Sequence, residues 1–228
     1  NFDMFKIPSG ELTNYPYLKA IAKTGLPVIL STGMANLDEI EKSINVLVSF
    51  GTKKREITVL HCNTEYPTPM IDVNLKAMLT IKKKLGVSIG YSDHTLGLEV
   101  PIAAVALGAE IIEKHFTLDR SLKGPDHKAS LEPNELKEMV IAIRNIEMAI
   151  SGNGLKEASL SEKKNIHIAR KSIHLSKDLK SGSIISEQDI ISLRPGDGIC
   201  TMNWENVIGK QVNKDLKKFT KLTLTDLS

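Results

Sequence analysis

The sequence predicts an α/β fold built on a parallel sheet, followed by a small, turn-rich domain made mostly of β-structure. Three observations lead to this prediction. Five short apolar runs alternate with segments whose apolar residues recur every three or four positions, glycines follow the ends of those segments, and the pattern changes after residues 151–154. Alternation of this kind indicates parallel strands joined by right-handed crossovers. Such a sheet is either an open doubly wound sheet or a closed eight-stranded barrel.

Each predicted strand is short and apolar, as is typical of strands buried on both faces. The five runs cover residues 5–8, 27–31, 57–62, 87–92 and 110–115. Amphipathic helices are expected between and after them, at residues 15–24, 37–50, 73–85, 100–107 and 133–150. Glycine is favoured just past the end of a helix, and four of these helices are followed by one, namely Gly25, Gly51, Gly86 and Gly108.

The last third of the chain has a different pattern. A glycine-rich stop at residues 151–154 leads into a charged stretch, and short apolar segments separated by turns follow. The predicted division is a sheet domain at residues 1–151, a linker at 152–164 and a small β-rich domain at 165–228. A domain of about 60 residues is close to the lower limit for independent folding, so we expect it to pack on a larger body or on a neighbouring chain.

Composition excludes several classes of protein. The 30 basic and 27 acidic residues nearly balance, and the lysines are scattered, so no nucleic-acid-binding surface is expected. No apolar run approaches the roughly 20 residues that span a bilayer. The two cysteines, Cys62 and Cys200, suit free thiols in a reducing cytoplasm. The apolar run that follows Asp3 has neither an initiating Met nor a leader before it, so we expect the chain to begin in mid-fold.

Polar residues follow all five predicted strands. In parallel α/β folds the chemistry gathers at the C-terminal ends of the strands. Single serines, threonines and glycines are ordinary loop residues, but five successive strand ends with hydroxyl, imidazole or acidic groups favour a functional site. The ends in question are residues 9–11, 31–33, 63–66, 92–94 and 115.

Two histidines are the strongest candidates for metal ligands. His94 and His115 each follow an apolar strand, and the two strands are consecutive. Neighbouring strands lie about 4.8 Å apart, so both imidazoles would open onto the same end of the sheet. Two imidazoles leave positions for water and substrate oxygens, as a Lewis-acid site with Mn²⁺ or Mg²⁺ requires. We interpret His61, His167 and His174 as structural.

A second group of residues predicts an anion site. Hydroxyl groups, a lysine and free backbone N–H groups at strand tips bind phosphate well. The candidates are Lys6, Ser9, Ser31 and Ser92, with Gly10 and Gly33 beside them.

Three acidic residues, Glu11, Glu113 and Asp126, are candidates for binding sugar hydroxyls or moving protons. Glu113 lies two residues before His115, so both side chains should share one face of the strand. The alternative for Glu113 is a buried partner of a lysine or a hydrogen bond to a ligand. The sequence does not choose between Glu11 and Glu113 as the proton-transfer group.

Six strand-end motifs, in order, resemble those of the bacterial N-acetylneuraminate (sialic acid) synthase family. They are FKIPSGE at 5–11, LSTGM at 30–34, LHCNTEYPTP at 60–69, GYSDHT at 90–95, EKHFT at 113–117 and GPDHK at 124–128. Residues 170–172 and 193–196 resemble the antifreeze-like (SAF) domain that follows the barrel in that family.

The resemblance implies a (β/α)₈ TIM barrel, of which the last five βα units are present and the first three strands are absent. His94 and His115 would hold a divalent metal, and phosphoenolpyruvate would contact Lys6, Ser9, Ser31, Thr64 and Ser92. The amino sugar would face Glu11, Tyr66 and Asp126. Arg194 would reach the partner's site in a domain-swapped homodimer. Without the first three strands, the 228 residues alone are not expected to be a working enzyme.

The resemblance also implies a reaction. The family condenses phosphoenolpyruvate with open-chain N-acetylmannosamine and water, giving N-acetylneuraminate and phosphate. A related alternative is a legionaminic or pseudaminic acid synthase that uses a modified 6-deoxy amino sugar. An alternative from another class is a non-catalytic carbohydrate-binding protein built on the small C-terminal domain.

Overall fold

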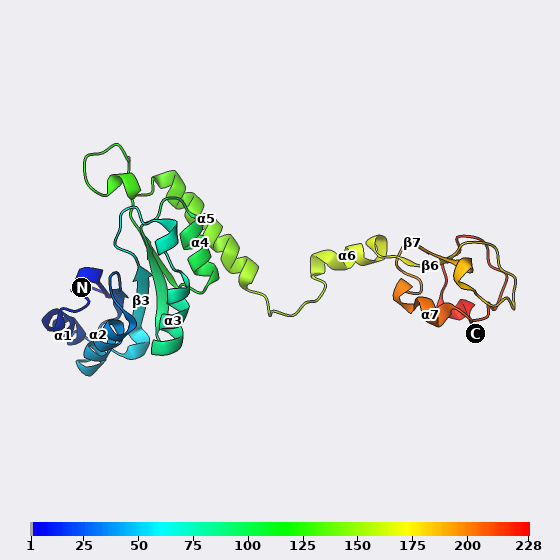
Figure 1. Cartoon of the computed structure of the whole chain (residues 1–228), viewed down its shortest axis with the longest axis horizontal. Coiled ribbons are helices and arrows are strands. Elements are labelled where there is room, and N and C mark those ends of the chain that lie inside the picture. The colour runs from blue at the N-terminus through cyan, green and yellow to red at the C-terminus, as the bar shows by residue number, and fades with distance from the viewer. Residues whose placement is uncertain (1) are drawn as a thin grey trace. The chain divides into compact units, whose positions relative to one another are not determined.

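The computed structural model describes residues 2–228, which fold as two compact units, residues 2–153 and 154–228 (Figure 1). In the first unit the five expected strands form one parallel sheet with the sequential order β1-β2-β3-β4-β5. Their bounds are β1 Phe5–Ile7, β2 Val28–Ser31, β3 Ile57–Cys62, β4 Ser88–Asp93 and β5 Ile111–Lys114. The parallel α/β prediction is therefore confirmed.

Five α-helices alternate with or follow these strands. They are α1 Tyr15–Ala22, α2 Leu37–Ser49, α3 Lys76–Leu85, α4 Glu99–Ala106 and α5 Pro133–Ile150. Local sequence explains where they begin and end. Asn36 and Glu39 form a reciprocal capping box at the start of α2, and Gly86 ends α3 in the left-handed conformation, with φ 60°. The third helix begins at Lys76, three residues later than expected, because Val73 follows a short 3₁₀ turn.

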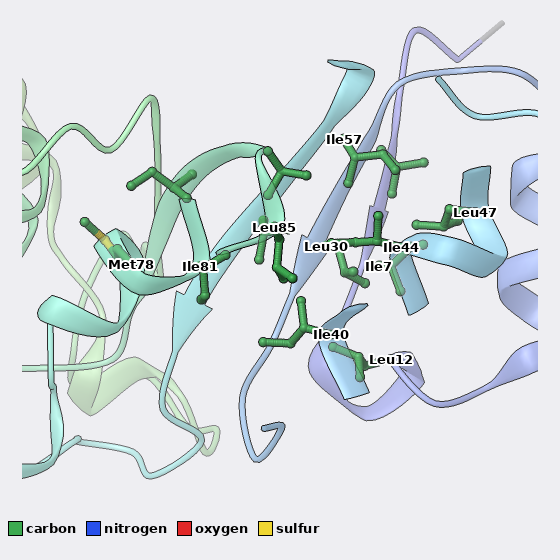
Figure 2. Packing of buried hydrophobic residues seen from close by; sticks show 14 of the residues in the cluster. Ile7, Leu12, Leu30, Ile40, Ile44, Leu47, Ile57, Met78, Ile81 and Leu85 are labelled. Atoms are coloured by element: carbon green, nitrogen blue, oxygen red, sulfur yellow. The ribbon is translucent and has the colours of Figure 1, made fainter. Parts of the chain in front are cut away.

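One face of the sheet carries the main core. Alternate strand residues such as Ile7, Leu30 and Ile57 are fully buried against apolar side chains of α1 to α4 (Figure 2). A doubly wound sheet reverses its strand order and has helices on both faces. The five described strands keep sequential order and bury their core on one face, so they form half of a barrel-like sheet.

The opposite face of the sheet carries the strand residues that alternate with those of the core, and several of these residues are less buried. Ile29, Thr58, Ser88 and Ile111 are only half-buried there. Strand register places Cys62 opposite Ser92, and Ser92 opposite Glu113, on this face. Polar groups near the strand ends are thereby brought together on the face without helices.

The second unit has a core of its own. Strands β6 (Ser172–Leu175) and β7 (Ile190–Leu193) pair antiparallel, and five isolated bridges connect the remaining turns. The most buried apolar residues of this core are Ile173, Leu175 and Leu222, each 0% exposed. A short helix, α7, spans Trp204–Val207.

The expected linker differs from the structure at its C-terminal end. Helix α6 (Leu160–Ala169) begins inside it, because Ser159 and Glu162 form a capping box. In residues 2–228 no helix is both long and apolar enough to cross a bilayer. Both cysteines are free, Cys62 buried and Cys200 exposed.

Candidate active site

A cavity of about 320 Å³ lies at the C-terminal ends of the five strands. Nine of the residues predicted from the sequence line it. They are Lys6, Ser9, Ser31, Thr64, Tyr66, Ser92, His94, Glu113 and His115, and the lining is completed by Pro8, Gly10, Met34 and Cys62.

Glu113 links two predicted phosphate ligands. Its carboxylate lies 3.1 Å from the Lys6 ammonium nitrogen and accepts a hydrogen bond of 2.7 Å from the Ser92 hydroxyl. Of the two interpretations of Glu113, the structure shows the pairing with a lysine, although the Glu113 side chain is 40% exposed. A bound anion would compete with this carboxylate for Lys6.

Ser9, which follows β1, and Ser31, the last residue of β2, form another wall of the predicted anion site. The Gly33 N–H donates to Ser9 Oγ at 2.9 Å, and Cys62 Sγ lies 3.2 Å from the same oxygen. Ser31 Oγ is buried and has no hydrogen-bond partner among the described residues. A buried hydroxyl without a partner is costly, so a ligand that accepts or donates there would be favoured.

Close packing in this wall depends on Gly33. A Cβ atom at this position would lie 2.5 Å from Thr64 Cγ2 and 2.9 Å from Ser9 Oγ. Any larger residue would therefore displace two predicted phosphoenolpyruvate contacts.

Three rings form the opposite side of the cavity. The ring centroids of His94 and His115 are 5.2 Å apart, with their planes at 87°. The Tyr66 ring lies 4.0 Å from the His94 ring and 5.2 Å from the His115 ring. All three rings come from segments that directly follow β3, β4 and β5.

One tautomer of His94 is selected by its surroundings. Its Nδ1 lies 2.5 Å from the Asn63 carbonyl oxygen, which can only accept, so Nδ1 carries the proton and Nε2 keeps its lone pair. Burial lowers the pKa of His94, and the neighbouring His115 lowers it further, against the Asn63 hydrogen bond. A neutral imidazole with one nitrogen held by a carbonyl is the usual state of a metal-binding histidine.

The two histidines therefore fit as part of a metal site. Within residues 2–228 no group of three or more His, Cys, Asp or Glu side chains could hold an ion alone. The imidazole pair would leave the other positions to water and substrate oxygens. Nitrogen ligands suit Mn²⁺ better than Mg²⁺, which prefers oxygen.

Three of the predicted site residues do not line the cavity. Glu11 accepts a hydrogen bond of 2.5 Å from the Asn14 amide and does not line the cavity. Asp126 lies at its border, with Oδ2 3.9 Å from His115 Nδ1. Arg194 belongs to the second unit, where its Nε donates to the Ala169 carbonyl at 3.0 Å.

Sequence reasoning did not assign Cys62 to the site. The available signal was its alternation with Val59 and His61, which places Cys62 on the face opposite the core, two residues before Thr64. A larger hollow of about 420 Å³ shares Cys62 and Met34 with the cavity and lies between α2 and α3. It gathers no comparable set of charged and hydroxyl groups, so the strand-end cavity is the better candidate.

Comparison with known proteins identifies a family for each part of the chain. The NeuB family model matches residues 1–156, and the SAF domain model matches residues 170–228. The N,N'-diacetyllegionaminic acid synthases of Campylobacter jejuni and Legionella pneumophila are 56% and 45% identical, over 94% and 95% of this chain. The chain spans 64% and 61% of these two relatives, slightly less than two thirds of their length.

A solved structure extends the comparison. The N-acetylneuraminic acid (sialic acid) synthetase of Leptospira borgpetersenii, in complex with citrate, is 42% identical, with a TM-score of 0.66. The match covers 73% of this chain and 57% of that one. Because the family model covers more than half of the residues and the site motifs fall within it, the chain belongs to the NeuB family.

Proposed function

We propose that the complete protein is a nonulosonate synthase, which condenses phosphoenolpyruvate with the open-chain aldehyde of an N-acetylated amino sugar. The observation that carries the proposal is one cavity in which Lys6 and three serine hydroxyls face a pair of histidines. An anion site next to a metal-ligand pair suits a reaction between a phosphorylated substrate and a carbonyl compound.

Residues within or just after β1, β2 and β4 hold phosphoenolpyruvate in this proposal. Lys6 acts as a point charge toward the phosphate or carboxylate, and the hydroxyls of Ser9, Ser31 and Ser92 donate hydrogen bonds. Thr64 closes the same wall. Displacement of Glu113 from Lys6 by the anion would free its carboxylate within the cavity.

The residues after β3 to β5 hold the aldehyde. His94 and His115 would bind Mn²⁺, which when bound supplies Lewis acidity to the aldehyde oxygen. The Tyr66 ring fixes the His94 ring and borders the sugar. Asp126, at the edge of the site, would accept from sugar hydroxyls.

The reaction balances as follows. C3 of phosphoenolpyruvate forms a bond to the aldehyde carbon, and the aldehyde oxygen takes up a proton. Water adds to C2 and gives up its two protons, one to the aldehyde oxygen and one to the leaving phosphate. The bond from C2 to the bridging oxygen breaks, so that phosphate leaves and C2 becomes a ketone carbon. Glu113 lines the cavity whereas Glu11 does not, so we assign the proton transfer to Glu113.

Two substrates compete within this class. The sequence alone favoured N-acetylmannosamine, but two relatives that share 56% and 45% identity are named N,N'-diacetyllegionaminic acid synthases. These names favour the modified 6-deoxy amino sugar as substrate. N-acetylmannosamine is kept as the second candidate.

Assembly is also part of the proposal. The sequential strand order supports closure of the sheet into a (β/α)₈ barrel by the rest of the protein, and so do the half-buried residues Ile29, Thr58, Ser88 and Ile111 on the face opposite the core. Arg194 would then complete the site of the partner in a swapped homodimer. Subunit exchange between Arg194→Ala and His94→Ala proteins tests this, because each heterodimer would contain one intact site and activity should return. Heterodimers that stay inactive would contradict the role.

The substrate test uses the complete protein with Mn²⁺, phosphoenolpyruvate and a panel of N-acetylated sugars. Phosphate release should require an aldose, and kcat/KM should be highest for the 2,4-diacetamido 6-deoxy sugar. A higher value for N-acetylmannosamine would support the sialic acid alternative. Folded protein that releases no phosphate with any sugar would support the non-catalytic alternative.

A further inference from the structure

A buried ion pair lies behind the cavity, on the face of the sheet that carries the helices. Asp93 and Lys114 are register partners on β4 and β5, and the Lys114 ammonium nitrogen lies 2.5 Å from Asp93 Oδ2. The two side chains are 0% and 2% exposed. Lys114 thus buries its side chain completely although its strand forms an edge of the described sheet.

Asp93 and Lys114 both also form hydrogen bonds with Thr95. The Lys114 ammonium donates to the Thr95 carbonyl at 2.6 Å, and Asp93 Oδ1 accepts from the Thr95 N–H at 3.0 Å and from its hydroxyl at 2.8 Å. These contacts fix the backbone directly before and after His94. The same lysine directly precedes His115, so one cluster joins the segments that carry both imidazoles.

The contacts of Asp93 and Lys114 are expected to add little to the free energy of unfolding. A buried ion pair gains little net stability, because desolvation offsets the Coulomb attraction, and an apolar pair of similar volume is often as stable. Its directed contacts, in contrast, fix where two chain segments lie relative to each other. Outer residues of this kind commonly orient the ligands of metal sites.

We propose that Asp93 and Lys114 are positioning residues, whose buried pair sets the separation and orientation of the His94 and His115 imidazoles. The inference rests on the proposed function in one respect, namely that the histidine pair binds Mn²⁺. Neither residue lines the cavity, so neither contacts substrate. Their effect is transmitted through the backbone at the ends of β4 and β5.

The test is the double variant Asp93→Asn, Lys114→Met in the complete protein. It removes both charges together, so no unpaired charge is left buried, and the amide that replaces the Asp93 carboxylate retains an oxygen acceptor for Thr95. We expect folded protein with Mn²⁺ affinity, measured by electron paramagnetic resonance of the free ion, reduced about tenfold or more. Affinity for phosphoenolpyruvate without metal should change less than twofold. If the double variant does not fold, Thr95→Val, which removes the hydroxyl that donates to Asp93 and leaves both charges paired, should shift Mn²⁺ affinity in the same direction.

The second unit offers a matched control. Asp226 is buried, pairs with Lys214 at 2.7 Å, and accepts from the N–H and hydroxyl of Thr223. The variant Asp226→Asn, Lys214→Met therefore removes from the second unit a charge pair with the same contacts to a threonine, although the Lys214 side chain is 62% exposed. It should leave Mn²⁺ affinity unchanged.

A second readout needs no metal. Long-range ¹H–¹⁵N spectra of the histidine rings in the metal-free protein should show the Nδ1–H form of His94 in the wild type and in the control. In the Asp93, Lys114 double variant this signal should be shifted or averaged. A wild type that binds no Mn²⁺ would refute the metal assignment, and the spectra would still decide the positioning role. Unchanged spectra, or unchanged Mn²⁺ affinity in a wild type that binds the ion, would overturn the positioning role.

Discussion

The two sides of the strand-end cavity are held in different ways. After β4 and β5, protein groups hold the histidine segments. Asn63 fixes the His94 ring, and the backbone carbonyls of His94 and His115 accept from the N–H groups of Thr68 and Leu131. At the end of β2, by contrast, Ser31 Oγ has no hydrogen-bond partner among the described residues.

This difference indicates which side is organised in advance. On the histidine side, the His94 ring is already held in the tautomer with a free Nε2 lone pair, as the proposed metal site requires. The anion side leaves a hydroxyl unsatisfied and pairs its lysine with a carboxylate from β5, so its arrangement should be completed by the ligand. Substitutions on the histidine side should therefore affect Mn²⁺ binding and kcat, whereas substitutions on the anion side should affect phosphoenolpyruvate binding.

The largest effect is expected from His94→Ala or His115→Ala in the complete protein. Each should reduce kcat roughly a thousandfold or more and abolish Mn²⁺ binding, since the Lewis acid supplies several kcal/mol of charge stabilisation. Phosphate release and metal titration measure the two effects. His167→Ala, in α6, is the control and should bind Mn²⁺ normally. Activity with bound metal in both site variants would refute the assignment.

A smaller effect, confined to one substrate, is expected from Lys6→Met. Loss of a charged hydrogen bond costs about 1.5–3 kcal/mol, so the KM for phosphoenolpyruvate should rise roughly 10- to 100-fold. The KM for the amino sugar should change little. Lys42→Met, which removes an exposed lysine paired with Asp38, should change neither constant. Equal changes in both KM values would argue against an anion role for Lys6.

Gly33→Ala sharpens the comparison without removing a polar group. The new methyl would collide with Thr64 Cγ2 and Ser9 Oγ and push both from the anion side. Affinity for phosphoenolpyruvate should fall about tenfold, an estimate that corresponds to the loss of about one hydrogen bond. Mn²⁺ affinity should be preserved, and an equal loss of both affinities would show that the two sides are coupled.

The smallest effect concerns His61, on the face of β3 that carries the core. Burial lowers the pKa of His61 below 6.5, against hydrogen bonds to the Val73 and Asn74 backbone. The unfolded chain therefore binds a proton at higher pH than the folded one, and stability falls as pH drops from about 6.5 through the folded pKa.

His61→Gln should remove this contribution and flatten the pH dependence. The change in slope cannot exceed about 1.4 kcal/mol per pH unit, the limit for one proton. Urea unfolding between pH 5 and 8 measures it. A steeper slope in the variant than in the wild type would contradict the assignment.

The sequence predicted the sheet well because buried parallel strands are continuous apolar runs with polar ends. The same alternation predicted that Glu113 and His115 share one face of the fifth strand, and the strand ends predicted the pair His94 and His115. It did not reveal the contact between Asp93 and Lys114, because the register between strands about 20 residues apart depends on packing of the whole sheet.

The direction of the Glu11 side chain and the presence of helix α6 depend on local geometry, which the spacing of apolar residues does not predict. Glu11 turns toward Asn14 in a short 3₁₀ turn, so its side chain does not follow the direction of β1. Helix α6 arises within a charged segment through a capping box at Ser159 rather than through an apolar stripe. Strand and helix patterns therefore located the site, whereas side-chain directions in the turns had to be observed.

A crystal structure of the complete protein with Mn²⁺ and phosphoenolpyruvate tests the central claim most directly. We expect an anomalous manganese peak within bonding distance of His94 Nε2 and a ring nitrogen of His115. The phosphoenolpyruvate anion should lie on Lys6, Ser31 and Ser92, with Glu113 displaced from the lysine. A manganese peak elsewhere, or an anion bound away from Lys6 while Glu113 keeps its pairing, would contradict the account.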